Sequence, residues 1–258
     1  ILLMIILSAC ISGYIFGENL NAQWWIIDDH EFMAFLGEDG VLPLREIPER
    51  LMMDTEVGDI GGKSRYRPSY YFLRLLETSL WGNNPMWFYA FRLLICTIFI
   101  FVCWQISSSM IGFLGGLVFT LALMSADYWP EIFSRLGPTE SYVVLGLSLF
   151  VFGFYGLIKN KPSRASALHC FLIFLGAIIS IGSKENMVIL AIPIMYLLGN
   201  SAAKKQLKIS QVVFSLAALL FSALIVYAVL LGLSNKGGRD IYATDVSAFA
   251  LSEILMNE

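Results

Sequence analysis

Charged residues are scarce in this chain. Of its 258 residues, 14% are charged and 57% are hydrophobic, with only two histidines and four cysteines. The cysteines all fall in apolar stretches, which points to packing and suggests neither a disulfide framework nor a zinc cluster. The sequence also contains no Gly-x-Gly-x-x-Gly or Walker loop and no basic stripe. These absences argue against nucleic-acid binding and soluble nucleotide chemistry.

Long apolar runs dominate instead, and the mean hydropathy is +0.71. A membrane core about 30 Å thick takes roughly 20 apolar residues per helix. Seven stretches are candidates: 1–16, 87–106, 110–126, 141–158, 167–181, 187–198 and 212–233. The fifth and sixth are counted separately because a single span would place Lys184 and Glu185 at the bilayer centre. The sequence therefore predicts an all-α, polytopic transmembrane helical bundle of about seven spans.

The connections between these spans differ in charge. The turns at 159–164 and 204–208 contain lysine or arginine and no acid, whereas the connection 17–86 carries an acidic excess. Cytoplasmic loops of membrane proteins collect Lys and Arg. We therefore expect the two basic turns in the cytoplasm and the acidic loop outside, together with Arg135 and Lys184.

The first outer loop is too long and too patterned to be a linker. Apolar and charged positions alternate near helical period at 31–36 and 44–53, whereas 70–81 is apolar but too short to span. We expect two or three short helices on the outer surface. We expect residues 1–233 to form one transmembrane module. Because the chain opens inside an apolar run, we expect a fragment of a longer protein, with 234–258 beginning a further extracytoplasmic segment.

An acidic run, Asp28-Asp29-His30-Glu31, directly follows an aromatic-rich apolar stretch. Adjacent carboxylates near an apolar surface repel each other, and desolvation raises the pKa of at least one of them. Such a carboxylate suits a general base or a cation site. The alternative is a helix N-terminus, capped by Asp28 or Asp29 with Glu31 in the first turn. A His-containing metal site is less favoured, because consecutive side chains do not point together.

The segment Lys63-Ser64-Arg65-Tyr66-Arg67-Pro68 is the strongest local signal for anion recognition. Pro68 favours an extended conformation at Arg67, which places Arg65 and Arg67 on the same face. Two neighbouring guanidinium groups match a phosphate. The alternative is a loop whose arginines anchor it on lipid headgroups.

The second outer connection, 127–140, predicts one short helix. Its Glu131 and Arg135 are four residues apart and can simply pair with each other. At a membrane boundary this pair, with Glu140 at the head of the fourth span, is costly enough to indicate a site. An equal alternative is that Thr139 caps that span, with Glu140 in its first turn.

Lys184 and Glu185 form the third outer turn. The lysine can reach a phosphate while Glu185 holds it in position, although two side chains reaching toward water explain the pair almost as well. Arg92, near the outer end of the second span, is also expected to reach outward.

Taken in order, these segments resemble the GT-C superfamily of membrane glycosyltransferases. The similar features are an acidic pair after the first span, Arg-Tyr-Arg-Pro before the second, Glu-x-x-x-Arg-x-Gly-Pro-x-Glu before the fourth, and Lys-Glu at a later outer turn. The resemblance covers nearly the whole chain and is closest to the bacterial users of polyprenyl-phosphate sugars. It implies inverting transfer of a sugar from a polyprenyl-phosphate donor to a hydroxyl of an acceptor glycan, lipid or protein. It places this reaction at the extracytoplasmic face of the bacterial inner membrane.

The resemblance also implies roles for individual residues. Asp28 would be the general base, with Asp29 as the competing choice. The set implied for the donor phosphate and sugar is Arg65, Arg67, Glu131, Arg135, Glu140, Lys184 and Glu185. A phosphate-linked donor demands no metal, whereas a diphosphate donor would favour a divalent cation held by Asp28, Asp29 or Asp127.

Two other classes remain as alternatives. A secondary transporter would need polar groups deep in its spans, whereas here the ionisable residues collect at the outer boundary. A non-catalytic membrane scaffold would have no reason to gather acids and arginines there.

Overall fold

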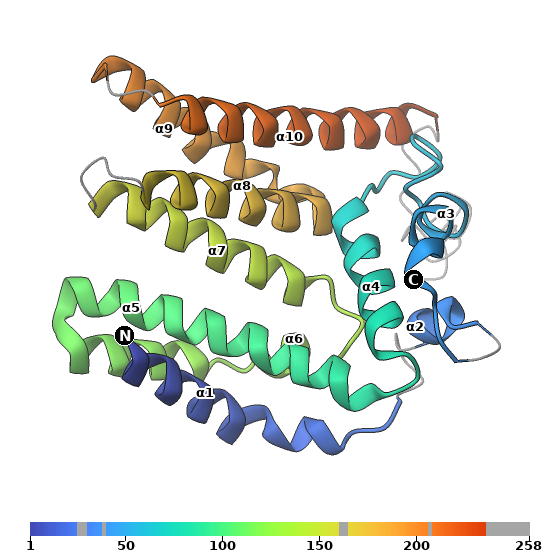
Figure 1. Ribbon diagram of the computed structural model, residues 1–258, viewed down its shortest axis with the longest axis horizontal. Coiled ribbons are helices and arrows are strands. Elements are labelled where there is room, and N and C mark those ends of the chain that lie inside the picture. The colour runs from blue at the N-terminus through green and yellow to red at the C-terminus, as the bar shows by residue number, and fades with distance from the viewer. Residues whose placement is uncertain (25–29, 38–39, 160–164, 206–207, 236–258) are drawn as a thin grey trace, which may run out of the picture.

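The computed structural model describes residues 1–24, 30–37, 40–159, 165–205 and 208–235 (Figure 1). All regular secondary structure within these ranges is helical, comprising the α-helices α1–α10 and the 3₁₀ helices η1–η3. The prediction of an all-α chain is therefore confirmed for the described residues. Of the expected segment 234–258, only Ser234 and Asn235 are described, and they form the end of α10.

Several helices are long and apolar enough to cross a membrane. Among the described residues there are five such segments: α1 (Leu2–Phe16) with η1 (Gly17–Asn21), α5 (Pro85–Met124), α7 (Glu140–Lys159), η3 (Glu185–Leu190) with α9 (Ala191–Ala203), and α10 (Ile209–Asn235). A sixth helix, α8 (Ala165–Ser183), carries a shorter apolar segment. The expectation of a membrane protein is thus supported, whereas the number seven is not confirmed by length and composition.

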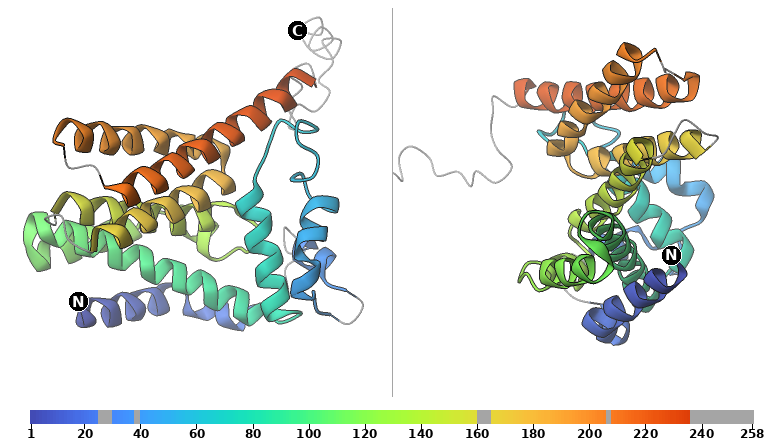
Figure 2. Two further views of the ribbon diagram at one scale, coloured as in Figure 1. Left: turned by 45° about the horizontal axis from the view of Figure 1, so that its top comes forward. Right: turned by 90° about the vertical axis from the view of Figure 1, so that its left-hand side faces the viewer.

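The longest element, α5, does not run straight. Gly112 interrupts it with φ 79° and ψ 167°, a conformation open to glycine at little cost. The indole Nε1 of Trp104 donates a hydrogen bond across this break to the carbonyl of Phe113 at 3.1 Å. The chain therefore doubles back at this point (Figure 1, Figure 2), slightly later than the predicted break at 107–109.

Close packing of α7 against α8 fixes one end of the bundle. A Cβ atom at Gly146 would lie 2.6 Å from the carbonyl oxygen of Gly176, and one at Gly176 would lie 2.4 Å from that of Gly146. Small residues let helix backbones approach this closely. Since α7 begins at Glu140 and α8 ends at Ser183, the pair brings Glu140 and Lys184 to the same end.

Three short helices occupy the first loop, as predicted: α2 (His30–Phe35), α3 (Ile47–Met53), preceded by η2 (Leu44–Glu46), and α4 (Pro68–Trp81). The third agrees only in part with the expected position on the outer surface, because one of its faces is buried. Helix α4 lies across the ends of the long helices (Figure 1, Figure 2), with Arg74, Leu75 and Thr78 fully buried. The Ser69 hydroxyl anchors it by donating to the carbonyl of Ile178 in α8 at 2.8 Å.

Two of the five hydrophobic clusters among the described residues join most of the long helices. One joins α7, α8, α9 and α10 around Ile173, Ala177 and Ile225. The other joins α1, α5, α7 and the short α6 (Trp129–Phe133) around Ile95 and Phe133. The four cysteines, Cys10, Cys96, Cys103 and Cys170, are all free thiols.

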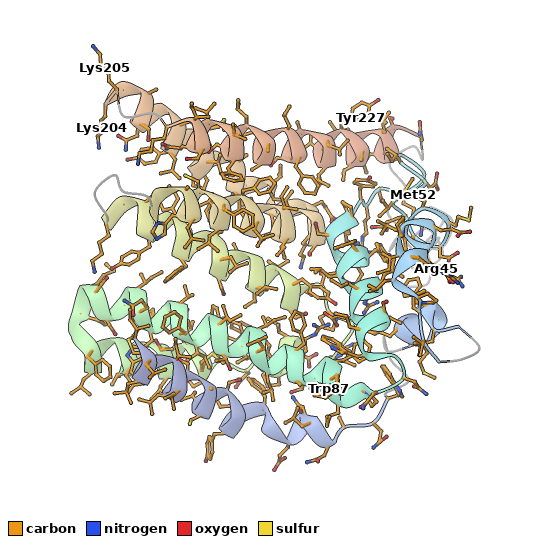
Figure 3. All side chains as sticks on the ribbon, viewed as in Figure 1. Arg45, Met52, Trp87, Lys204, Lys205 and Tyr227 are labelled. Carbon is orange, nitrogen blue, oxygen red and sulfur yellow. The ribbon has the colours of Figure 1, made fainter. Side chains whose placement is uncertain are left out.

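Lys204 and Lys205 lie at the opposite end of the molecule from the first loop (Figure 3). Lys204 and Lys205 project at one end, while Arg45, Met52 and Trp87 mark the other (Figure 3). This separation agrees with the prediction that the turn at 204–208 and the loop 17–86 face opposite sides of a membrane.

Candidate functional site

A polar pocket of about 350 Å³ lies where α4, the beginning of α7 and the turn after α8 meet. Three segments far apart in the sequence line it: Arg65, Arg67, Tyr70 and Arg74; Gly137, Pro138, Thr139 and Glu140; and Lys184 and Glu185. The structure therefore gathers five residues that the sequence singled out for donor binding, namely Arg65, Arg67, Glu140, Lys184 and Glu185.

The segment that carries Arg65 rests on the end of α10. The Asn235 amide donates a hydrogen bond to the carbonyl of Gly61 at 3.2 Å. A Cβ atom at Gly232 would lie only 1.8 Å from the carbonyl oxygen of Lys63, so this crossing requires glycine. These contacts with α10 fix the position of the loop that carries Arg65 to the pocket.

Arg67 is held by neighbours on its own side of the pocket. Its Nε donates to Glu56 at 3.0 Å, and its guanidinium lies 5.1 Å from the ring centre of Tyr70 and 5.6 Å from that of Tyr71. Burial works to lower the pKa of Arg67, but the ion pair with Glu56 outweighs it and raises that pKa above its usual value. Arg67 is therefore a fixed positive charge.

Arg74 also lines the pocket, and the sequence analysis missed it. Its guanidinium lies between two rings, 4.3 Å from the centre of Phe32 and 4.5 Å from that of Tyr70. Its Nη2 donates to the carbonyl of Gly137 at 3.0 Å, and the side chain is fully buried. The available signal was its spacing, because a residue seven positions after Arg67 returns to the same face of a helix.

Two hydrogen bonds to one carbonyl oxygen hold the Gly137-Pro138 segment against α4. The carbonyl of Gly137 accepts hydrogen bonds from both Arg74 and the Tyr70 hydroxyl, the latter at 2.9 Å. Burial raises the pKa of Tyr70 well above its usual value, which keeps this hydroxyl a donor. The second wall of the pocket is thus fixed to the first.

The predicted partner of Lys184 is wrong. Its ammonium group pairs with the carboxylate of Glu140, not with its sequence neighbour Glu185. Lys184 has extended backbone geometry (φ −149°, ψ 117°) between α8 and η3, which turns it toward the start of α7. One carboxylate oxygen of Glu185, Oε2, is shielded from solvent and has no hydrogen-bond partner among the described residues.

Glu131 and Arg135 do not line the pocket. They pair with each other at 2.9 Å, with side chains 70% and 44% exposed, as the simpler alternative predicted. The short helix predicted for 127–140 is present as α6, which ends at Phe133, before Arg135. The structure thus separates this pair from the other five predicted residues.

The predicted catalytic pair, Asp28 and Asp29, lies outside the described residues. The chain resumes with α2 at His30, and the ring of Phe32 packs against Arg74 in the pocket wall. Among the described residues, no group of three His, Cys, Asp or Glu side chains can hold a metal ion.

A buried group of hydrogen-bonded side chains, Glu77, Arg92 and Tyr142, lies next to the pocket and is called the ionic layer below. Arg92 donates to both carboxylate oxygens of Glu77, at 3.0 and 3.2 Å, and to the hydroxyl of Tyr142 at 3.1 Å. The Arg92 side chain is only 1% exposed, so the expectation that it reaches outward is wrong. Burial raises the pKa of Glu77, and Arg92 opposes that shift. The layer joins α4, α5 and α7, and the rings of Tyr142 and Tyr70 connect it to the pocket at 5.9 Å.

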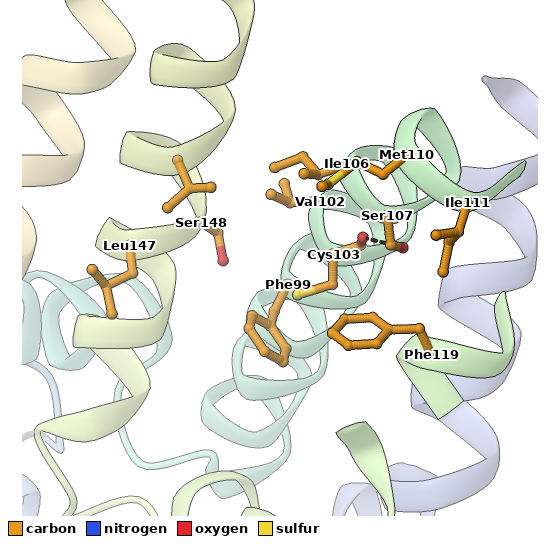
Figure 4. A pocket seen from close by; sticks show the side chains of 11 residues that line it. Phe99, Val102, Cys103, Ile106, Ser107, Met110, Ile111, Phe119, Leu147 and Ser148 are labelled. Carbon is orange, nitrogen blue, oxygen red and sulfur yellow. Dashed lines mark hydrogen bonds between the residues drawn. The ribbon is translucent and has the colours of Figure 1, made fainter. Parts of the chain in front are cut away.

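A second cavity, of about 630 Å³, lies between α5 and α7 (Figure 4). Its lining is almost wholly apolar and includes Phe99, Ile106, Phe119 and Leu147. The hydroxyl of Ser107 donates to the carbonyl of Cys103 at 2.7 Å in its own helix. This cavity is suited to hydrocarbon and not to polar chemistry.

No protein-family model, curated protein or solved structure matches this chain. Fold and pocket together define a helical protein with several candidate membrane spans and a cation-rich pocket at one end. An assignment of function therefore depends on the chemistry of that pocket.

Proposed function

We propose that the chain is the membrane-embedded part of a glycosyltransferase of the GT-C type. It transfers a sugar from a polyprenyl-phosphate donor to a hydroxyl of a glycan, lipid or protein acceptor outside the membrane. The observation that carries this proposal is the convergence of Arg65, Arg67, Arg74, Lys184 and two carboxylates in one pocket at the end of an apolar bundle.

The charge of the pocket supports a phosphate ligand. Four basic side chains and two carboxylates line it, which leaves positive charge in excess. Charge-assisted hydrogen bonds from such groups are strong, and guanidinium groups match phosphate geometry. The cations are also held in place, because Glu56 fixes Arg67 and Glu140 pairs with Lys184. Preorganised charge of this kind stabilises a departing phosphate without further rearrangement.

In the proposed reaction, the acceptor hydroxyl oxygen attacks the anomeric carbon of the donor. The bond from that carbon to the phosphate oxygen breaks, and the phosphate leaves with the bonding electron pair. A carboxylate takes the hydroxyl proton, and attack from the opposite face inverts the anomeric carbon. We assign this base to Asp28, with Asp29 as the alternative, because both shortly precede Phe32 in the sequence and Phe32 packs against Arg74 of the pocket. No metal is required for a monophosphate donor.

We further propose seven membrane crossings with the pocket on the extracytoplasmic side. The break at Gly112 divides α5 into two antiparallel arms. The second arm, 113–124, is only roughly 18 Å long by helix rise, so residues 125–139, with α6, complete that crossing. Helix α8, with 19 residues, reaches roughly 28 Å and approaches the ~30 Å core. An even number of crossings between the turns at 159–164 and 204–208 keeps both basic turns on one side.

Binding of a lipid phosphate to the full chain tests this proposal. The probe is radiolabelled farnesyl phosphate, and the variant is Arg65→Ala, with Arg45→Ala as a control because Arg45 is exposed and does not line the pocket. We expect Arg65→Ala to weaken binding by roughly tenfold or more, since one charge-assisted contact is lost. Equal binding by both variants, or no binding by the unaltered chain, would contradict the proposal.

A further inference from the structure

Glu185 is the one carboxylate in the pocket with an oxygen that accepts nothing from the described residues. Its neighbour Lys184 is engaged by Glu140, which comes from another helix. The carboxylate of Glu140 also accepts from the Thr139 hydroxyl at 3.3 Å. Glu185 Oε2, by contrast, is shielded from water and has no partner in the described part of the chain. Both carboxylate oxygens of Glu140 therefore accept hydrogen bonds from the protein, whereas Oε2 of Glu185 accepts none from the described residues.

An unmet acceptor of this kind is costly. A buried polar atom without a hydrogen bond loses the stabilisation that water gave it, and a charged atom loses more. Native structures leave few such atoms, and those that remain call for an explanation such as a ligand. Glu185 lines the pocket, so a rotation of its carboxylate toward that space would let Oε2 accept from a hydrogen-bond donor on a bound molecule and would remove this cost.

The neighbouring charges select the kind of donor. Four basic side chains line the same pocket, against two carboxylates, so a cationic group on a ligand would meet net repulsion. A neutral hydroxyl meets no such repulsion and still donates to a carboxylate.

We infer that Glu185 accepts a hydrogen bond from a hydroxyl of the sugar next to the donor phosphate and so determines which sugar is bound. This inference rests on the proposed function and divides the two carboxylates of the site. Glu140 is a positioning residue for Lys184, and Glu185 is a specificity residue that contacts the sugar. The ligand is then a lipid phosphate that bears a polyhydroxylated group, not a bare lipid phosphate.

Binding of paired probes to the full chain tests this division. The probes are farnesyl phosphate and a panel of farnesyl-phosphate-linked hexoses and pentoses, including the deoxy analogues of any preferred sugar. The variants are Glu185→Ala and Glu185→Gln, with Glu49→Ala as a control that removes an exposed carboxylate outside the pocket. Because affinity is compared within each variant, a folding defect that weakens both probes equally does not affect the result.

We expect the unaltered chain and Glu49→Ala to prefer one sugar-bearing probe over farnesyl phosphate by tenfold or more. Glu185→Ala should lose this preference while keeping its affinity for farnesyl phosphate, and it should not distinguish one deoxy analogue from its parent. Glu185→Gln, which retains a weaker acceptor, should fall between the two. A site built for a hydroxyl rejects the analogue that lacks it strongly, so the difference is measurable.

Two results would overturn the inference while leaving the proposed function standing. One is binding of farnesyl phosphate without a preference for any sugar in the panel. The other is an unchanged preference in Glu185→Ala. If farnesyl phosphate itself does not bind, the proposed function fails first, and this inference fails with it.

Discussion

The ammonium group of Lys184 contacts the carboxylate of Glu140, although 44 positions separate these residues in the sequence. This contact exists because α7 begins where α8 ends, and the glycine contact between Gly146 and Gly176 holds the two helices together. The pair closes one side of the polar pocket. Glu185 therefore does not hold Lys184 in position, although its place next to Lys184 in the sequence suggested that role.

If Glu140 acts through Lys184, the two side chains are energetically coupled. We expect Lys184→Ala to weaken binding of farnesyl phosphate and Glu140→Gln to weaken it less. In the double variant, the second change should add little to the first, because residues in contact are not additive. Full additivity of the two effects in a double-mutant cycle would show that Glu140 acts on the ligand independently.

The crossing of α10 and the loop at Lys63 gives a test outside the pocket. Gly232→Ala places a Cβ atom against the carbonyl of Lys63, and such overpacking costs about 1–3 kcal/mol. We expect a lower Tm and weaker binding of farnesyl phosphate, since the loop that carries Arg65 must move. The control is Gly199→Ala, because nothing lies within 4 Å of a Cβ atom at Gly199. Equal behaviour of the two variants would argue that α10 does not set the position of Arg65.

The buried ion pair between Arg92 and Glu77 predicts a large loss of stability. Glu77→Ala leaves the Arg92 guanidinium buried without its carboxylate, which costs on the order of 3–5 kcal/mol. The exposed pair of Arg50 and Asp54 is the control, and Arg50→Ala should cost only ~0.3–0.5 kcal/mol. Thermal unfolding in detergent measures both. A small effect of Glu77→Ala would show that the pair contributes little to the fold.

Topology can be tested by labelling from outside intact cells, with single cysteines in a background that lacks the four native ones. We expect Arg45→Cys to react and Lys204→Cys to be protected, since the two lie at opposite ends (Figure 3). The reverse pattern would place the pocket on the cytoplasmic side and contradict the proposed orientation.

The sequence predicted the helices well but predicted poorly which side chains contact one another, for a physical reason. Apolar periodicity and the cost of a buried Lys184 are local properties, so the separation of α8 from α9 was correctly predicted. The pairing of Glu77 with Arg92 depends on how α4 crosses α5, which no local pattern records. The amphipathic sequence of α4 also suggests a helix on the surface, because it does not reveal that the polar face packs against other helices. Arg74 was missed for the same reason.

The assignment of a general base is the central claim, and sugar transfer in membranes tests it most directly. The measurement is transfer of radiolabelled sugar from a polyprenyl-phosphate donor by the full-length protein, compared with Asp28→Asn and Asp29→Asn. Loss of the base should reduce the rate by about 10²–10⁴-fold in Asp28→Asn, with farnesyl phosphate still bound. Near-normal turnover in both variants, or no transfer by the unaltered protein, would contradict the account.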